Sequence, residues 1–97
     1  MKTLMIQRVP GLFGQPRDTR ILSDESIVGE MKADEKEKKL EISKGEHSIQ
    51  AEISDDGGRK YRSNVYFTKY GNKDVTLYLK IQGSKLTLLD RPADAEK

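Results

Sequence analysis

Cations and aromatic residues occur together in one stretch of the chain, and of all its residues these are the best suited to contact a ligand. The stretch combines a basic run with tyrosines, namely Arg59, Lys60, Tyr61, Arg62, Tyr66 and, further along, Tyr78. Aromatic faces stack on bases or sugars, and guanidinium groups contact phosphates. A ligand-binding module for carbohydrate or nucleic acid is therefore the alternative function. The blander interpretation is that Tyr66 and Tyr78 lie on a solvent face and pack across strands.

The remaining polar residues do not form a pattern typical of an enzyme. His47 is the only histidine, so a two-histidine metal site is excluded. A Ser-His-Asp arrangement would have to use His47 itself. We expect His47 to hydrogen-bond backbone at a strand end. The pairs Asp24, Glu25 and Asp55, Asp56 lack calcium-loop spacing and predict turns. No phosphate-binding loop or nucleophile elbow occurs, so no catalytic residue, metal or cofactor is predicted.

Two large apolar residues stand in a segment of turn residues. Leu12 and Phe13 lie between Gly11 and Gly14 within the sequence PGLFGQPRD. Such side chains at a loop tip either fold back over the end of the domain or contact a partner. Leu12 and Phe13 are therefore the candidate contact residues for a protein partner or for self-association.

Composition limits the class of protein. The chain has 97 residues, which suits one domain with a small core, and 35% of them are charged. The net charge of +2 does not favour a nucleic-acid partner. Cysteine is absent, and the apolar residues near the N-terminus are too few for a signal peptide or a membrane span. We therefore expect a cytoplasmic protein.

Alternating apolar and polar residues predict β-strands. The clearest alternations are Lys38 to Ser54, interpreted as a half-buried hairpin around Gly45, and Asp74 to Gln82. Their in-phase residues predict the core: Leu40, Ile42, Ile49, Ala51, Ile53, Val75, Leu77, Leu79 and Ile81. Weaker strands are expected at 2–9, 19–23, 27–31, 64–70 and 84–89, with Ile27, Gly29 and Met31 sharing one face.

One segment leaves an alternative open. Residues 24–39 could form a helix capped by Ser23, but the apolar stripe stops after Met31, which favours a charged loop over 32–37. About seven short strands predict a small antiparallel β-sandwich of the immunoglobulin-like kind, with a closed barrel as the alternative. The sandwich domain is expected to span residues 1–89, and residues 90–97 to form a disordered tail.

Residues 20–53 resemble the small bacterial immunoglobulin-like domains of the PEGA type. The matching features are a strand leading to Asp24, Gly29 in the return strand, and the Gly-x-His-x-apolar run of Gly45, His47 and Ile49. The family usually has Asp-Gly at the turn, where this chain has Asp24 and Glu25. The resemblance implies an immunoglobulin-like fold and an appendage or binding module without catalytic residues. Together with the residues, it predicts a non-catalytic protein-interaction or structural accessory module of bacterial origin.

Overall fold

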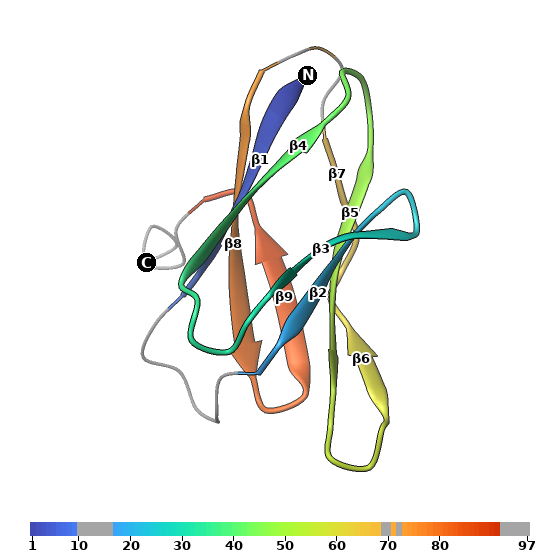
Figure 1. Cartoon of the computed structure of the whole chain (residues 1–97), viewed down its shortest axis with the longest axis vertical. Helices are drawn as coiled ribbons and strands as arrows, with labels where there is room; N and C mark the ends of the chain where they lie inside the picture. Colours follow the sequence, from blue (N-terminus) through green and yellow to red (C-terminus); the bar gives the residue numbers. More distant parts are fainter. Residues whose placement is uncertain (10–16, 69–70, 72, 92–97) are drawn as a thin grey trace.

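All regular structure in the described residues is β-strand. The computed structural model describes residues 1–9, 17–68, 71 and 73–91. Its strands form a four-stranded and a five-stranded sheet (Figure 1). In chain order they are β1 (Lys2–Arg8), β2 (Thr19–Ser23), β3 (Ser26–Met31), β4 (Glu37–Ile42), β5 (Ser48–Ser54), β6 (Lys60–Arg62), β7 (Tyr66–Phe67), β8 (Val75–Gln82) and β9 (Lys85–Leu89).

The all-β prediction is confirmed, although the strands number nine rather than about seven. β3 and β4 occupy most of residues 24–39, so the helical alternative for this segment is wrong. The predicted strand at 64–70 is reduced to the two-residue β7, and Lys69 and Tyr70 lie outside the described residues. In the part of the chain that is described, no helix exists that could cross a membrane.

The four-stranded sheet has the order β4-β1-β8-β9. β1 pairs antiparallel with β4 but parallel with β8, so the prediction of a purely antiparallel architecture is wrong. Side-chain alternation shows which face of a strand is buried, whereas strand direction depends on the connections. In this chain, β4 and all strands of the five-stranded sheet lie between β1 and β8 in the sequence, so a long connection joins the two parallel strands.

The five-stranded sheet has the order β3-β2-β5-β6, and β7 also pairs with β5. A register shift in the β2–β3 pair leaves Val28 without a partner, because Ile21 pairs with Gly29 while Leu22 pairs with Ile27. Such a bulge reverses the phase of the side chains on its strand. Met31 is buried but Ile27 is 61% exposed, so the prediction that both share one face is wrong.

The predicted hairpin over residues 38–54 is wrong in its pairing and right in its buried faces. β4 pairs with β1, and β5 pairs with β2, so the connection around Gly45 crosses from one sheet to the other. Gly45 has φ 106°, a conformation that favours glycine. Ile42 and Ile49 are both buried, but they reach the core from opposite sheets.

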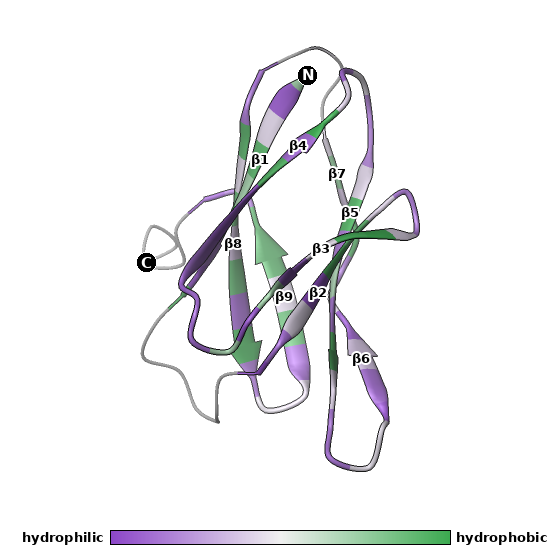
Figure 2. Cartoon of the chain, viewed as in Figure 1, coloured by the Kyte–Doolittle hydropathy of each residue, from purple (hydrophilic) through white to green (hydrophobic). Residues whose placement is uncertain are grey.

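Both sheets contribute to one apolar core. Hydrophobic residues recur along β5, β8 and β9, while the connections between strands are mostly hydrophilic or intermediate (Figure 2). The buried core cluster consists of Leu4, Ile6, Ile21, Met31, Ile42, Ile49, Ala51, Ile53, Leu77, Leu79, Leu86 and Leu88. Leu40, Val75 and Ile81 are partly buried against it. The remaining predicted core positions are fully buried, so the sequence-based assignment of buried faces is confirmed.

Candidate functional site

The outer face of the five-stranded sheet is where exposed apolar residues gather. β5 turns Ile49, Ala51 and Ile53 into the core, so its alternate residues Ser48, Gln50 and Glu52 face outward. Phe67 of β7 pairs with Ser48 on one side of β5. On the other side of β5, Leu22 of β2 pairs with Gln50. Side chains from three strands therefore meet on this outer face.

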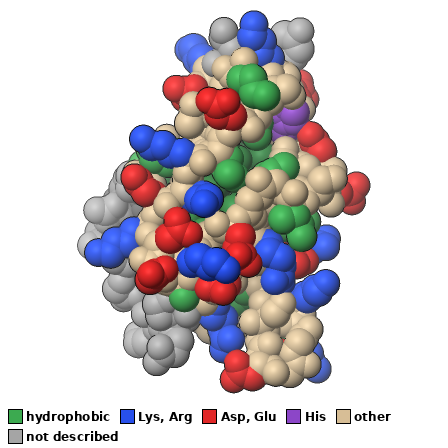
Figure 3. All heavy atoms as spheres, viewed as in Figure 1, with side chains coloured by type: hydrophobic (Ala, Val, Ile, Leu, Met, Phe, Trp, Pro, Cys, Tyr) green, Lys and Arg blue, Asp and Glu red, His purple; other side chains and the backbone are tan. Residues whose placement is uncertain are grey.

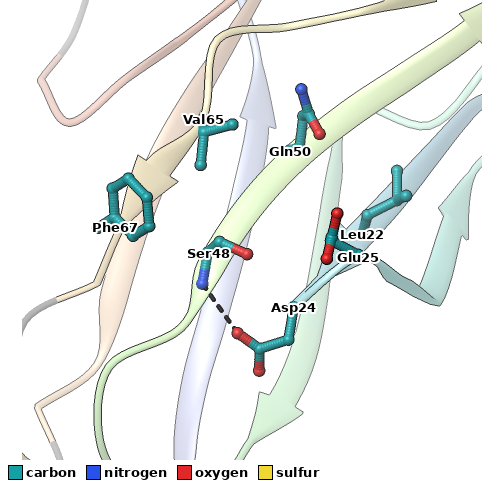
Figure 4. Close-up of a pocket in the computed structure, with 7 residues that line it drawn as sticks. All are labelled: Leu22, Asp24, Glu25, Ser48, Gln50, Val65 and Phe67. Carbon is teal, nitrogen blue, oxygen red and sulfur yellow. Dashed lines mark hydrogen bonds between the residues drawn. The ribbon is translucent and has the colours of Figure 1, made fainter.

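A groove runs along β5 between β7 and the β2–β3 turn (Figure 4). Its volume is about 400 Å³, and its lining consists of Leu22, Asp24, Glu25, Ser48, Gln50, Val65 and Phe67. Val65 and Phe67 stand on one side of β5, and Leu22 with the two acidic residues stands on the other (Figure 4). The groove thus has apolar walls, a polar floor and an acidic margin.

Two large apolar side chains of the groove lining are exposed, and two more are exposed on β3. Ile27 is 61% exposed, Val28 42%, Val65 44% and Phe67 67%, and among the described residues Met1 is the only other large hydrophobic that is exposed. Elsewhere, charged side chains of both signs are scattered over the face shown in Figure 3. Apolar residues that cluster on a domain with so many charges mark a surface suited to contact with another protein.

The acidic margin is formed by a two-residue turn with an uncommon backbone. Asp24 has φ 53° and Glu25 has φ 69°, a conformation that a turn of this kind needs and that glycine adopts most readily. Asp24 is held there, because its backbone N–H donates to Ser48 O at 2.9 Å and its Oδ1 accepts from Ser48 N at 3.1 Å. The Glu25 carboxylate has no ion-pair or hydrogen-bond partner among the described residues.

Asp24 also binds His47. His47 Nδ1 lies 2.6 Å from Asp24 Oδ2, and Nε2 lies 2.8 Å from Ser43 O and 3.1 Å from Ser43 Oγ. A carboxylate and a carbonyl oxygen can only accept, so these partners assign a proton to each ring nitrogen. The hydrogen bond to Asp24 raises the pKa of His47, with burial and the Lys2 ammonium opposing it, and the same bond lowers the pKa of Asp24.

This arrangement resembles a catalytic Ser-His-Asp set in its residue types but not in its protonation. A general base needs a ring nitrogen without a proton facing the serine hydroxyl. In His47 that nitrogen, Nε2, donates to the Ser43 carbonyl instead. Asp24, His47 and Ser43 therefore act as a clamp that joins the β2–β3 turn to the β4–β5 connection. The predicted backbone hydrogen bond of His47 is present, whereas its contact with Asp24 was not foreseen.

Charged residues occupy the other end of the same face. Glu52 is 3% exposed, and its two carboxylate oxygens accept from Arg20 Nε at 2.6 Å and from Arg62 Nε at 2.8 Å. The arginines flank it on β2 and β6, directly across from it in the sheet. Their hydrogen bonds lower the pKa of Glu52, mainly through Arg62. Glu30 of β3 stands across from Arg20 in the sheet and binds Lys32 Nζ at 2.7 Å, so cations and anions are interleaved at this end.

The structure does not bring the predicted Tyr/Arg cluster together on one surface. Tyr61 and Tyr66 pair with Ile53 and Ile49 and pack against the core, so the expectation that Tyr66 points outward is wrong. Tyr61 also donates its hydroxyl to Asp55 Oδ2 at 3.1 Å. Arg62 faces outward and is held by Glu52, and Arg59 is exposed in the preceding turn. The Arg62 side chain and the rings of Tyr61 and Tyr66 therefore lie on opposite sides of the sheet.

The structure does not describe the predicted contact residues, and it shows the predicted turn at Asp55. Leu12 and Phe13, the expected contact residues, lie outside the described part of the chain, as do residues 92–97 of the expected tail. Asp55 forms the predicted turn, because its Oδ1 accepts from the backbone N–H groups of Gly57 and Arg59 at 2.9 and 2.8 Å. Within residues 1–9, 17–68, 71 and 73–91, no three His, Asp or Glu side chains converge into a group that could hold a metal ion.

Sequence reasoning missed the groove itself. Val65 and Phe67 alternate with Asn64, Tyr66 and Thr68, so the segment carries large residues on both faces and its phase is ambiguous from sequence. The available signal was this double apolar character, which indicates that both faces of the strand are covered. The adjacent apolar pair Ile27 and Val28 carries the same signal.

No protein-family model matches the chain, and neither the curated proteins nor the solved structures contain a match.

Proposed function

We propose that this chain is an immunoglobulin-like β-sandwich that acts as a non-catalytic protein-interaction module, with the groove beside β5 as its contact surface. The observation that carries the proposal is the apolar cluster at that groove, where Phe67 is 67% exposed and Val65 44% exposed. Burial of such side chains against a partner contributes about 25 cal/mol for each Å² removed from water. The resemblance to PEGA-type domains, which are appendages and binding modules, agrees with this role.

The polar chemistry of the site supports a role without catalysis. The Nε2 proton of His47 is committed to a backbone carbonyl, and Glu52 is held by two arginines. These groups fix the shape of the face, and the apolar side chains between them are left for contact.

A photoreactive amino acid placed at position 67 tests the proposal in cells of the source organism. We expect irradiation to link the chain to one defined protein. The matched control carries the same residue at Tyr78, which β8 turns away from the core on the outer face of the other sheet. A defined product at 67 and none at 78 supports the proposal. Equal labelling at both positions, or none at 67, would overturn it.

A further inference from the structure

Among the described residues, the groove beside β5 is lined by two carboxylates and by no cation. The Asp24 charge is balanced by protonated His47, whose Nδ1 lies 2.6 Å from Asp24 Oδ2. Glu25 is exposed and has no ion-pair or hydrogen-bond partner in the described part of the chain. One uncompensated negative charge therefore stands at the margin of the groove.

The cations elsewhere on this face of the sheet are already held by other carboxylates. Arg20 Nε and Arg62 Nε both bind Glu52, at 2.6 and 2.8 Å. Lys32, which follows β3, binds Glu30 of that strand at 2.7 Å. None of these three cations lines the groove, so the acidic margin is open to a cation from another molecule.

The opposite wall of the groove is apolar. Phe67 is 67% exposed, and Val65 beside it is 44% exposed. Phe67 pairs with Ser48 from the β7 side, and Asp24 N–H donates to Ser48 O from the β2 side. Neighbouring strands lie about 4.8 Å apart, so about 10 Å separates the backbone of the apolar wall from that of the acidic margin.

The turn that carries Glu25 is held in place before any ligand binds. Asp24 bonds to the backbone of Ser48 in both directions, at 2.9 and 3.1 Å, and its second carboxylate oxygen binds His47. Glu25 lies with Leu22 on one side of β5, across the groove from the apolar wall (Figure 4). Because hydrogen bonds to β5 fix this margin, little backbone ordering is needed on binding.

The size of the groove favours an extended ligand. Its volume is about 400 Å³, and it follows the single strand β5. An α-helix with its side chains is about 10 to 12 Å across, as wide as the whole groove. An extended segment can instead lay its side chains between the two walls.

We infer that the occupant of the groove is an extended segment of a partner protein in which a Lys or Arg lies close in sequence to a large apolar residue. The apolar side chain packs against Val65 and Phe67, and the cation pairs with Glu25. This inference rests on the proposed function, because it names the chemistry of the partner at the same groove. An extended chain advances about 3.3 Å per residue, so the two contacts, about 10 Å apart, correspond to a spacing of about three residues.

Selection from a phage-displayed library of random linear peptides tests the inference. The purified parent chain is the bait, and peptides that also bind Phe67→Ser are removed. We expect the selected peptides to share a Lys or Arg about three positions from a large apolar residue. Failure to select any peptide, or selection of peptides without this pair, would overturn the inference.

A charge exchange with one selected peptide, made synthetically, tests whether Glu25 is the partner of the cation. At low salt we expect Glu25→Gln to bind the peptide about two- to fivefold more weakly than the parent chain, and Glu25→Lys at least about tenfold more weakly. Replacement of the cation in the peptide by Glu should restore binding to Glu25→Lys. An exchange that restores nothing, or parent affinity in Glu25→Gln, would contradict the assignment.

Glu30→Gln is the matched control, because Glu30 belongs to β3 of the same hairpin but does not line the groove. We expect this variant to bind the peptide as the parent chain does. Equal weakening by Glu25→Gln and Glu30→Gln would indicate a general effect of charge and would overturn the inference.

These outcomes are separable from those of the proposed function. If position 67 links to a protein in cells but the selected peptides lack the cation, the interaction role stands and the inferred chemistry of the partner is wrong. A crosslinked product of two copies of this chain would likewise overturn the inference, in favour of self-association. If position 67 links to nothing, the proposed function itself fails.

Discussion

The Asp24 carboxylate joins the β2–β3 turn to both β5 and the β4–β5 connection, through Ser48 N and His47 Nδ1. Because His47 is the only histidine, its titration can be followed without interference from another imidazole. The Asp24–His47 contact is therefore an electrostatic contact whose titration can be followed directly by experiment.

Stability should fall as the pH rises above about 6.5, the usual pKa of a histidine. Folding raises the pKa of His47 above its usual 6.5 through the hydrogen bond to Asp24. The folded state therefore holds the proton more tightly than the unfolded chain does. Its contribution is complete below about pH 6.5 and is lost as the pH rises through the raised pKa. Urea unfolding at a series of pH values measures this slope.

His47→Gln is the control, because the variant keeps a polar group but has no titration in this range. We expect its free energy of unfolding to be flat where that of the parent chain declines. Equal slopes in the two proteins would assign the decline to another group. The change in the free energy of unfolding at acid pH is less informative. The pKa values of Asp24, Glu52 and Asp55 are all lowered, so all three carboxylates contribute to it.

Replacement of Glu25 by glycine should stabilise the fold. At φ 69° a side chain is strained, whereas glycine is not. After the extra flexibility of glycine in the unfolded chain is subtracted, we expect a gain of about 0.5 to 1 kcal/mol. Glu25→Ala keeps the strain and should give no gain. Thermal unfolding at low concentration makes the comparison, and a loss of stability with glycine would contradict the backbone assignment.

At the scale of the elements, two edge strands of opposite sheets meet at Gly29 of β3 and Leu40 of β4. A Cβ at Gly29 would lie 2.7 Å from Leu40 Cδ2, so there is no room for a side chain unless Leu40 moves. Position 29 requires glycine because the Leu40 side chain approaches so closely, and not because of the backbone conformation there.

Gly29→Ala should therefore destabilise the fold by about 1 to 2 kcal/mol. The double-mutant cycle with Leu40→Ala separates the clash from other effects of alanine. We expect the cost of Gly29→Ala to disappear when Leu40 has already been shortened. An unchanged cost in the Leu40→Ala background, measured by urea unfolding, would show that the clash is not its source.

The elements also show what the sequence could and could not predict. The alternation in β5 and β8 was sufficient to assign buried faces, since burial depends on each strand alone. It could not show that β4 and β5 belong to different sheets, because that depends on pairing partners. The bulge at Val28 and the irregular stretch before Tyr66 each reversed a phase, so Ile27 and Tyr66 were assigned to the wrong faces.

At the scale of the whole molecule, the core shared by the two sheets should dominate stability. Leu77 of β8 is fully buried, and its replacement by alanine should cost about 2 to 5 kcal/mol, a large part of the 5 to 15 kcal/mol expected for a domain. Tyr78→Ala, at the next and outward-facing position, should cost much less. A loss under about 0.5 kcal/mol at Leu77 in urea unfolding would contradict the assignment of the core.

From sequence, the function is predicted only at the level of an interaction module, and it stays a prediction. Composition and missing motifs argued against catalysis, but the groove depends on β7 lying beside β5 and on the turn at Asp24 lying beside Ser48. These are contacts between segments far apart in the chain. Leu12 and Phe13, the contact residues expected from sequence, remain a prediction.

The most direct test of the contact face compares the parent chain, Phe67→Ser and Tyr78→Ser in their association with the protein that crosslinks at position 67. Because Phe67 is 67% exposed, its loss should change the free energy of unfolding by no more than about 0.5 kcal/mol, or a few degrees in Tm. We predict at least about tenfold weaker association for Phe67→Ser and none of this loss for Tyr78→Ser. Association of Phe67→Ser at the parent strength, or equal weakening in both variants, would contradict the account.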